Sequence, residues 1–69
     1  QESITVSIFK DTHTLKIFDT AGKLMITQKV TSSSASNEII NISALKPGQY
    51  VVQVISDKEA LSAAFAVMR

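Results

Sequence analysis

One histidine, six carboxylates and a cluster of serines are the side chains of this sequence that could take part in catalysis or bind a metal ion. His13 has no cysteine and no second histidine with which to share a metal, and it is expected at the surface or at a strand edge. The carboxylates fall mostly near predicted turns and ends, where turn geometry and solubility account for them, and they lack the spacing of a calcium loop. They are Glu2, Asp11, Asp19, Glu38, Asp57 and Glu59.

The serines do not form a nucleophile site either. Ser32, Ser33, Ser34 and Ser36 lie in the polar stretch "TSSSASN", residues 31–37, which has no partner base and is predicted to be a connecting loop. Because catalysis needs a nucleophile, a base and a group that orients them, we predict that the chain is not an enzyme. We also expect no cofactor, no metal ion and no small-molecule substrate.

Length and composition limit the function further. The 69 residues give room for one domain, residues 1–69, and a domain of this size buries only about 60% of its unfolded surface. No cysteine is present, so disulfides cannot supplement the core. The net charge of +1 is scattered, which gives no electrostatic basis for nucleic-acid binding, and no apolar run approaches the roughly 20 residues of a membrane helix. The first residues do not resemble a signal peptide, and the chain is expected to be one module of a larger protein.

Hydrophobic side chains alternate along most of the chain, which is typical of half-buried strands. In the first such segment, Ile4, Val6 and Ile8 fall on one face. The last, "ALSAAFAVM", is rich in alanine, which favours helix, but its larger side chains alternate. The pattern predicts six strands and no helix, at residues 3–9, 13–19, 23–30, 38–42, 49–56 and 60–68.

Two turns have specific residue requirements. In "DTAG", Asp19 is expected to accept a hydrogen bond from the backbone two residues on, and Gly22 to take the positive φ of a hairpin with a bulge. This predicts a hairpin between the second and third strands. In "KPGQ", Pro47 and Gly48 fit the central positions of a type II turn. Tyr50 is expected to pack its ring over this turn, with its hydroxyl at the surface.

Short strands joined by such turns predict an antiparallel sandwich or a small barrel, and the fifth strand favours the sandwich. Its residues Val51, Val52, Val54 and Ile55 place apolar side chains on both faces. We expect this strand to be central in its sheet, and either covered on both faces or in contact with a partner on one of them.

The order and spacing of several short motifs resemble the C-terminal sorting domain of type IX secretion cargo. "LKIFDTAGKLM" is similar to the apolar strand and hairpin of that family, and "INISALKPGQYVVQV" is similar to its later glycine, tyrosine and alternating valines. The resemblance covers about residues 4–69. The matching positions are Ile17, Asp19, Gly22, Lys23, Leu24, Ile40, Ile42, Ser43, Leu45, Gly48, Tyr50, Val52, Val54, Val67 and Arg69.

The sequence also departs from the family pattern. It lacks the "Y-P-N-P" segment that usually precedes the first strand, and it has "NIS" where "D-L-S" is commoner. Its last strand ends in a single arginine where the family usually has several lysines, which bears on how much charge contributes to recognition of the tail.

The resemblance implies an all-β, antiparallel, immunoglobulin-like sandwich of about six to seven strands that acts as an export address. It implies transient passage through the periplasm, export across the outer membrane, and a final place at the cell surface or in the medium. The partners that it implies are the type IX outer-membrane translocon and shuttle, and a sortase-like protease. The open edges of a small sandwich also allow a homodimer through an edge strand.

Recognition is predicted at the matching motifs and at the chain end, namely Asp19, Gly22, Lys23, Leu45, Pro47, Gly48, Tyr50, Val67, Met68 and Arg69. The alternative interpretation is a generic immunoglobulin-like or fibronectin-like spacer or binding module of a surface protein. With one tyrosine, three phenylalanines and no tryptophan, the chain has few rings to bind sugar, but this does not argue against a spacer. Part of an enzyme's catalytic domain is the least supported interpretation.

Overall fold

The structure of the chain is a computed structural model, which describes residues 2–9, 11–30 and 37–68. These residues form six strands and no helix, close to the predicted segments. None of the described residues belongs to a helix long and apolar enough to cross a membrane. The strands are β1 (Ser3–Ser7), β2 (Thr12–Asp19), β3 (Leu24–Lys29), β4 (Asn37–Asn41), β5 (Gly48–Ser56) and β6 (Ala60–Val67).

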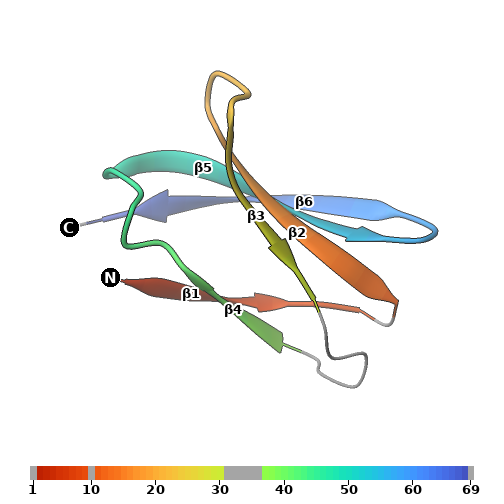
Figure 1. Ribbon diagram of the computed structural model, residues 1–69. Helices are drawn as coiled ribbons and strands as arrows, with labels where there is room; N and C mark the ends of the chain where they lie inside the picture. The colour runs from red at the N-terminus through yellow and green to blue at the C-terminus, as the bar shows by residue number, and fades with distance from the viewer. Residues whose placement is uncertain (1, 10, 31–36, 69) are drawn as a thin grey trace.

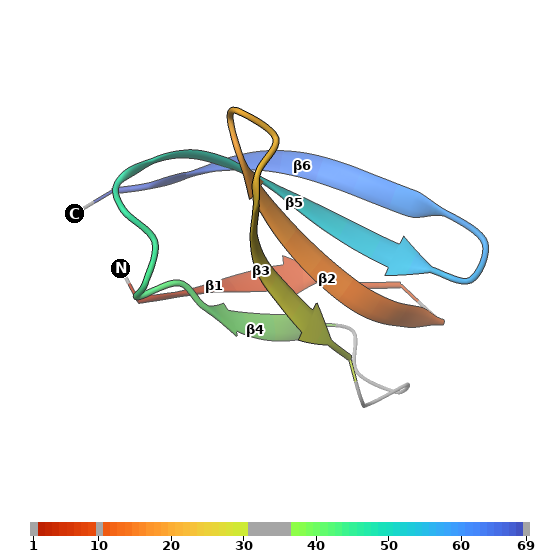
Figure 2. The same cartoon turned by 45° about the horizontal axis from the view of Figure 1, so that its top comes forward.

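The strands form two antiparallel sheets that face each other (Figure 1, Figure 2). One sheet has four strands in the order β3-β2-β5-β6, and the other consists of β1 and β4. An all-β chain arranged in this way is a small β-sandwich, and the predicted fold class is confirmed.

The order of the described strands follows that of the immunoglobulin fold. In that fold, strands C′, C, F and G are neighbours in one sheet, and strands A, B and E are neighbours in the other. Here β3, β2, β5 and β6 take the places of C′, C, F and G, while β1 and β4 take those of B and E. No described strand occupies the place of A, beside β1.

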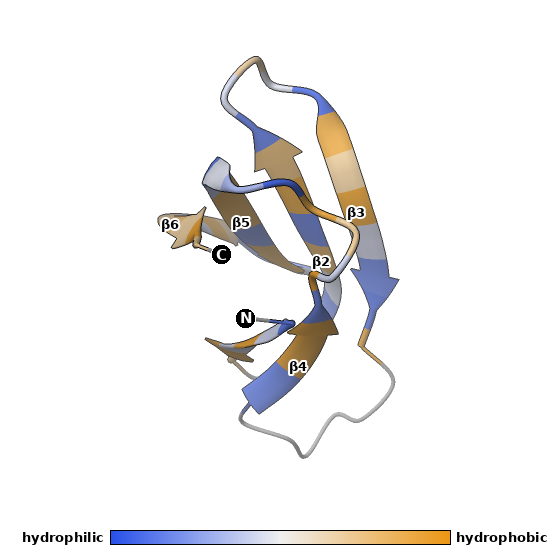
Figure 3. Ribbon diagram, turned by 90° about the vertical axis from the view of Figure 1, so that its left-hand side faces the viewer, coloured by the Kyte–Doolittle hydropathy of each residue, from blue (hydrophilic) through white to orange (hydrophobic). Residues whose placement is uncertain are grey.

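The core lies between the two sheets and contains buried hydrophobic residues from both of them. Figure 3 shows hydrophobic residues recurring along the strands β2, β3 and β5 of the larger sheet. Leu15 and Ile17 of β2 are 0% exposed, and Ile40 of β4 is 1% exposed. Burying an aliphatic side chain of this size contributes about 1.5–3 kcal/mol. In a chain without disulfides, this layer is the main source of stability.

Within the four-stranded sheet, burial declines from the inner strand β2 toward the edge strand β6. Leu15 in β2 pairs with Val54 in β5, which pairs with Leu61 in β6. Along this row the exposed fraction of the residue rises from 0% to 7% and then to 55%. The two-stranded sheet is therefore too narrow to cover β6.

The strand β5 is central in its sheet, as predicted, but only one of its faces is fully covered. Val52 and Val54 are buried against the core, whereas Val51 and Ile55 on the outer face are half-buried. Of the two predicted alternatives, cover on both faces is not met within the described chain, because no second layer packs on the outside of this sheet. A partner on that outer face stays a prediction.

Tyr50 ties the start of β5 to the loop before it. Its hydroxyl donates a 2.6 Å hydrogen bond to the Lys46 carbonyl oxygen, and the residue is only 6% exposed. The prediction that this hydroxyl lies at the surface is therefore wrong. Its ring stacks against Phe65 of β6, with the two ring centroids 5.8 Å apart. A tyrosine near the start of strand F that bonds to the backbone a few residues upstream is the tyrosine corner of immunoglobulin-like sandwiches.

Replacing Tyr50 by phenylalanine should lower the free energy of unfolding by about 1 kcal/mol, because the substitution removes the hydrogen bond to Lys46 and keeps the ring. In a domain of this size, a loss of about 1 kcal/mol lowers the melting temperature by roughly 4–8 °C. Thermal unfolding followed by circular dichroism measures the change. The control is Lys46→Ala, which keeps the accepting carbonyl and should change the stability by less than about 0.5 kcal/mol. A larger loss from Lys46→Ala than from Tyr50→Phe would contradict this account of the corner.

Candidate functional site

Strand pairing brings the predicted recognition residues from three separate stretches to one end of the four-stranded sheet. Asp19, the last residue of β2, pairs with Tyr50 of β5. Gly48, the first residue of β5, pairs with Val67, the last residue of β6. Figure 1 shows the C-terminal end of β6 beside the loop that enters β5. We call this region the motif end, and its described residues are Asp19, Gly22, Lys23, Leu45, Pro47, Gly48, Tyr50, Val67 and Met68.

Asp19 holds the turn between β2 and β3 through its carboxylate. Its Oδ1 atom accepts hydrogen bonds from the backbone N–H groups of Ala21 and Lys23, both at 2.9 Å. The Gly22 N–H donates to the Asp19 carbonyl oxygen at 3.0 Å, and Gly22 has a φ of +86°. A register shift in the β2–β3 pairing marks a bulge. The predicted hairpin, its aspartate contact and its glycine are therefore confirmed.

The loop before β5 differs from the predicted type II turn. Gly48 has a φ of +152°, whereas the second central residue of a type II turn has a φ near +80°. Gly48 is already part of β5 and pairs with Val67, so the chain is extending at this point. The Lys46 carbonyl, which would close a type II turn, accepts the Tyr50 hydroxyl instead. The predicted turn type is wrong, although the positive φ still favours glycine at this position.

Leu45 anchors the same loop in the core. The residue is 2% exposed, and its N–H donates to the Ile42 carbonyl oxygen at 2.9 Å. The turn that precedes it is closed by Asn41, whose Oδ1 atom accepts the Ser43 N–H at 2.8 Å. Leu45 therefore acts by packing, and a partner cannot reach its side chain while the loop is folded.

The end of β6 combines a buried residue with an exposed one. Val67 is 2% exposed and pairs with Gly48, so it fixes the position of the residue that follows. That residue, Met68, is 73% exposed. Arg69, also predicted to take part in recognition, lies outside the described residues.

Exposure separates the residues of the motif end that build the fold from those that a partner can touch. Leu45, Tyr50 and Val67 are buried, and Asp19 is committed to its turn. The exposed residues are Gly22, Lys23, Pro47, Gly48 and Met68. This set offers a cation, an apolar side chain and accessible backbone, which suits contact with a protein and supplies no nucleophile or base.

His13 lies near the other end of β2 and is exposed, as predicted. Its Nε2 atom is 3.5 Å from Oδ1 of Asp57, its Nδ1 atom is 2.8 Å from Oγ1 of Thr14, and 49% of its side chain is exposed. A contact this exposed contributes little to stability. Among the residues that the structure describes, no group of three or more histidine, cysteine, aspartate or glutamate residues could hold a metal ion.

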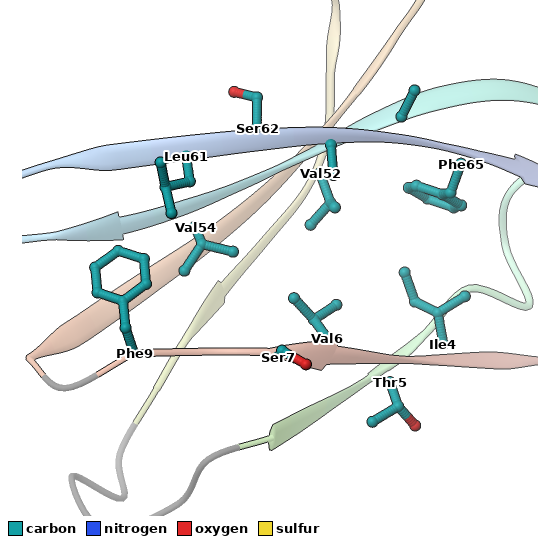
Figure 4. Close-up of a pocket in the computed structure, with 12 residues that line it drawn as sticks. Ile4, Thr5, Val6, Ser7, Phe9, Val52, Val54, Leu61, Ser62 and Phe65 are labelled. Atoms are coloured by element: carbon teal, nitrogen blue, oxygen red, sulfur yellow. The ribbon is translucent and has the colours of Figure 1, made fainter.

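One feature of the surface was not predicted from the sequence. An apolar groove of about 590 Å³ lies between β1 and the inner faces of β5 and β6 (Figure 4). The signal that could have indicated it is the sequence of β6, "ALSAAFAV", which carries no charge although the strand forms an edge of its sheet.

Comparison with known protein families agrees with the motifs and the fold. Residues 1–68 match the family described as the secretion system C-terminal sorting domain. The chain belongs to this family. No curated protein matches the chain.

The sorting domain is a C-terminal signal for type IX secretion, and the resemblance stated from the motifs is confirmed. Such a signal directs export across the outer membrane, to the cell surface or the medium. The family is one of secretion signals, and its match gives no support to a generic spacer.

Asp19→Ala should lower the free energy of unfolding of the sorting domain by about 1–2 kcal/mol, because two backbone N–H groups of the turn lose their acceptor. Asp19→Asn keeps an oxygen at the same position, and we expect it to lose less than half as much. Urea denaturation of the purified variants measures both changes. Equal losses would show that the charge of the carboxylate, and not its position as an acceptor, holds the turn.

Proposed function

We propose that the sorting domain addresses its cargo by presenting the motif end to the type IX outer-membrane translocon, with Met68 and the adjoining end of β6 as the contact surface. The observation that supports this best is the pairing of Asp19 with Tyr50 and of Gly48 with Val67. Through these pairs, motifs from distant parts of the sequence meet beside the exposed Met68.

The chemistry of this surface favours a protein partner. Met68 is a long, flexible, apolar side chain that is 73% exposed, and methionine adapts readily to the shape of a partner's apolar pocket. Beside it, β6 has no neighbour on its outer edge within the described chain, so its backbone groups are available to a partner strand. The buried residues of the motif end hold this surface in a fixed geometry.

In this proposal the domain itself carries out no reaction. Cargo in the periplasm is delivered by the shuttle to the translocon, and a sortase-like protease then acts on the chain upstream of the folded domain at the cell surface. An edge-strand homodimer is a separate part of the proposal, and the mass of the purified domain by light scattering tests it.

A fusion experiment tests whether residues 1–69 are sufficient to direct export. Residues 1–69 are attached to the C-terminus of a periplasmic fluorescent reporter in a bacterium with a type IX system, and fluorescence is measured at the cell surface and in the medium. We expect export that stops when the translocon is disabled. Met68→Asp should reduce export at least tenfold, which corresponds to about 1.4 kcal/mol of lost binding, because the carboxylate must be desolvated at an apolar contact.

The matched control is Met25→Asp, which changes the same residue type at a position of β3 that is 39% exposed and lies outside the motif end. Both variants should keep the melting temperature of the parent domain. Normal export of a folded Met68→Asp fusion would show that the contact surface lies elsewhere on the domain. Retention of the folded parent fusion would show that residues 1–69 are not a sufficient address.

A further inference from the structure

We infer that the groove between β1 and β6 is the seat of one further β-strand, formed by the polypeptide that directly precedes Gln1 in the cargo protein. The inference goes beyond the proposed function and rests on one part of it, which is that a C-terminal sorting domain follows a cargo. It assigns to the sorting domain a strand that its own described residues do not contain.

The side chains that point into the groove are all apolar (Figure 4). Ile4 and Val6 of β1 point toward the four-stranded sheet, while Val52 and Leu61 point back toward β1. The polar side chains of Thr5 and Ser62 point away from the groove. Small-molecule sites combine an apolar lining with a few convergent polar groups, which this groove lacks. Its lining therefore fits the apolar face of a strand.

The backbone of β1 offers that strand a set of unused hydrogen-bonding groups. The Ile42 N–H donates to the Glu2 carbonyl oxygen at 2.8 Å, which places Glu2 in a hydrogen-bonded pair with the neighbouring chain. Such pairs alternate along an antiparallel ladder, so the N–H and C=O groups of Ser3, Thr5 and Ser7 point away from β4. They point toward the edge on which β1 has no partner among the described strands.

The two sides of the sandwich differ in how their edges are protected. On the side of β3 and β4, Gln28 links the two sheets, because its Nε2 atom donates to Oε2 of Glu38 at 3.0 Å and to the Ile39 carbonyl oxygen at 3.1 Å. On the groove side, the edge strands read "SITVS" and "ALSAAFAV", with no charge and no proline. Natural proteins protect exposed edges with charges, prolines or bulges. The bare edge of β1 indicates that a strand pairs with it in the intact protein, while the edge of β6 stays open to the partner strand of the proposed function.

The preceding polypeptide is the occupant that the geometry favours. Because cargo precedes the domain, the chain must reach β1 through Glu2, two residues before Ile4, which lines the groove. A short turn there returns the chain antiparallel to β1, and the tether gives the segment an effective concentration in the millimolar range. The resulting strand would occupy the place of strand A, which lies beside B in the immunoglobulin fold. A strand and its turn require about ten residues.

Backbone hydrogen exchange on the full-length cargo protein tests the inference. It is compared with a variant in which the ten or so residues before Gln1 are replaced by a Gly-Ser segment of equal length. We expect the Thr5 and Ser7 amides to exchange at least tenfold faster in the variant. The amides of Ile17 and Val54 belong to the inner strands β2 and β5, and they should remain protected in both proteins.

Each other result of the exchange experiment would overturn the inference. Slow exchange at Thr5 and Ser7 in both proteins would mean that another molecule covers the edge, and protection that rises with protein concentration would identify that molecule as a second copy. Fast exchange in both would mean that the groove stays open. Exchange does not depend on transport, so failure of the export test leaves this result interpretable.

A substitution in the groove gives an independent test. Leu61→Asp places a carboxylate where the strand would pack, and should lower the melting temperature of the full-length protein's sorting domain by at least 5 °C while leaving the Gly-Ser variant nearly unchanged. Leu24→Asp is the matched control, since Leu24 is 47% exposed and does not line the groove. Equal effects of Leu61→Asp in the two backgrounds would contradict the inference.

Discussion

The position of Tyr50 is the constraint on which the rest of the sandwich depends. Its hydroxyl fixes the start of β5 against the Lys46 carbonyl, and β5 is the strand that joins β2 to β6. Because Tyr50 pairs with Asp19 on one side and Phe65 on the other, the registers of both neighbours are set from this point. A slip of one residue would turn every inward side chain of β5 outward. The same contact therefore maintains the core and brings the motifs of the motif end together.

A second property of the fold is the unequal width of its sheets. Two strands cannot cover four, so both edge strands of the larger sheet are less buried than β2 and β5, although Gln28 links the two sheets on the side of β3. The buried row through Leu15 and Val54 ends in the exposed Leu61. The groove between β1 and β6 is thus a consequence of the unequal width of the two sheets.

The sequence was sufficient for features that are decided locally. Alternation predicted the six strands, and the Asp19 turn followed from the residues that build it. The prediction of the turn at Gly48 is wrong because Pro47 and Gly48 fit a type II turn locally, whereas the chain extends there to pair with Val67, which is distant in the sequence. The Lys46 carbonyl accepts the Tyr50 hydroxyl instead of closing the turn. The incomplete cover of β5 and the groove depend on how many strands the opposing sheet contributes. Alternation within a segment carries no information on that number.

The start of β1 and the end of β6 lie at the same end of the molecule (Figure 1, Figure 2). The further strand inferred beside β1 would run antiparallel to it, and would therefore move the point where cargo joins the domain to the opposite end of the sandwich. A load between the cargo and the C-terminal end of β6 would then act along the strands and not across them. The hydrogen bonds of the ladder beside β1 would share the force instead of breaking one after another. The inferred strand would thus decide the direction in which the domain resists a pull.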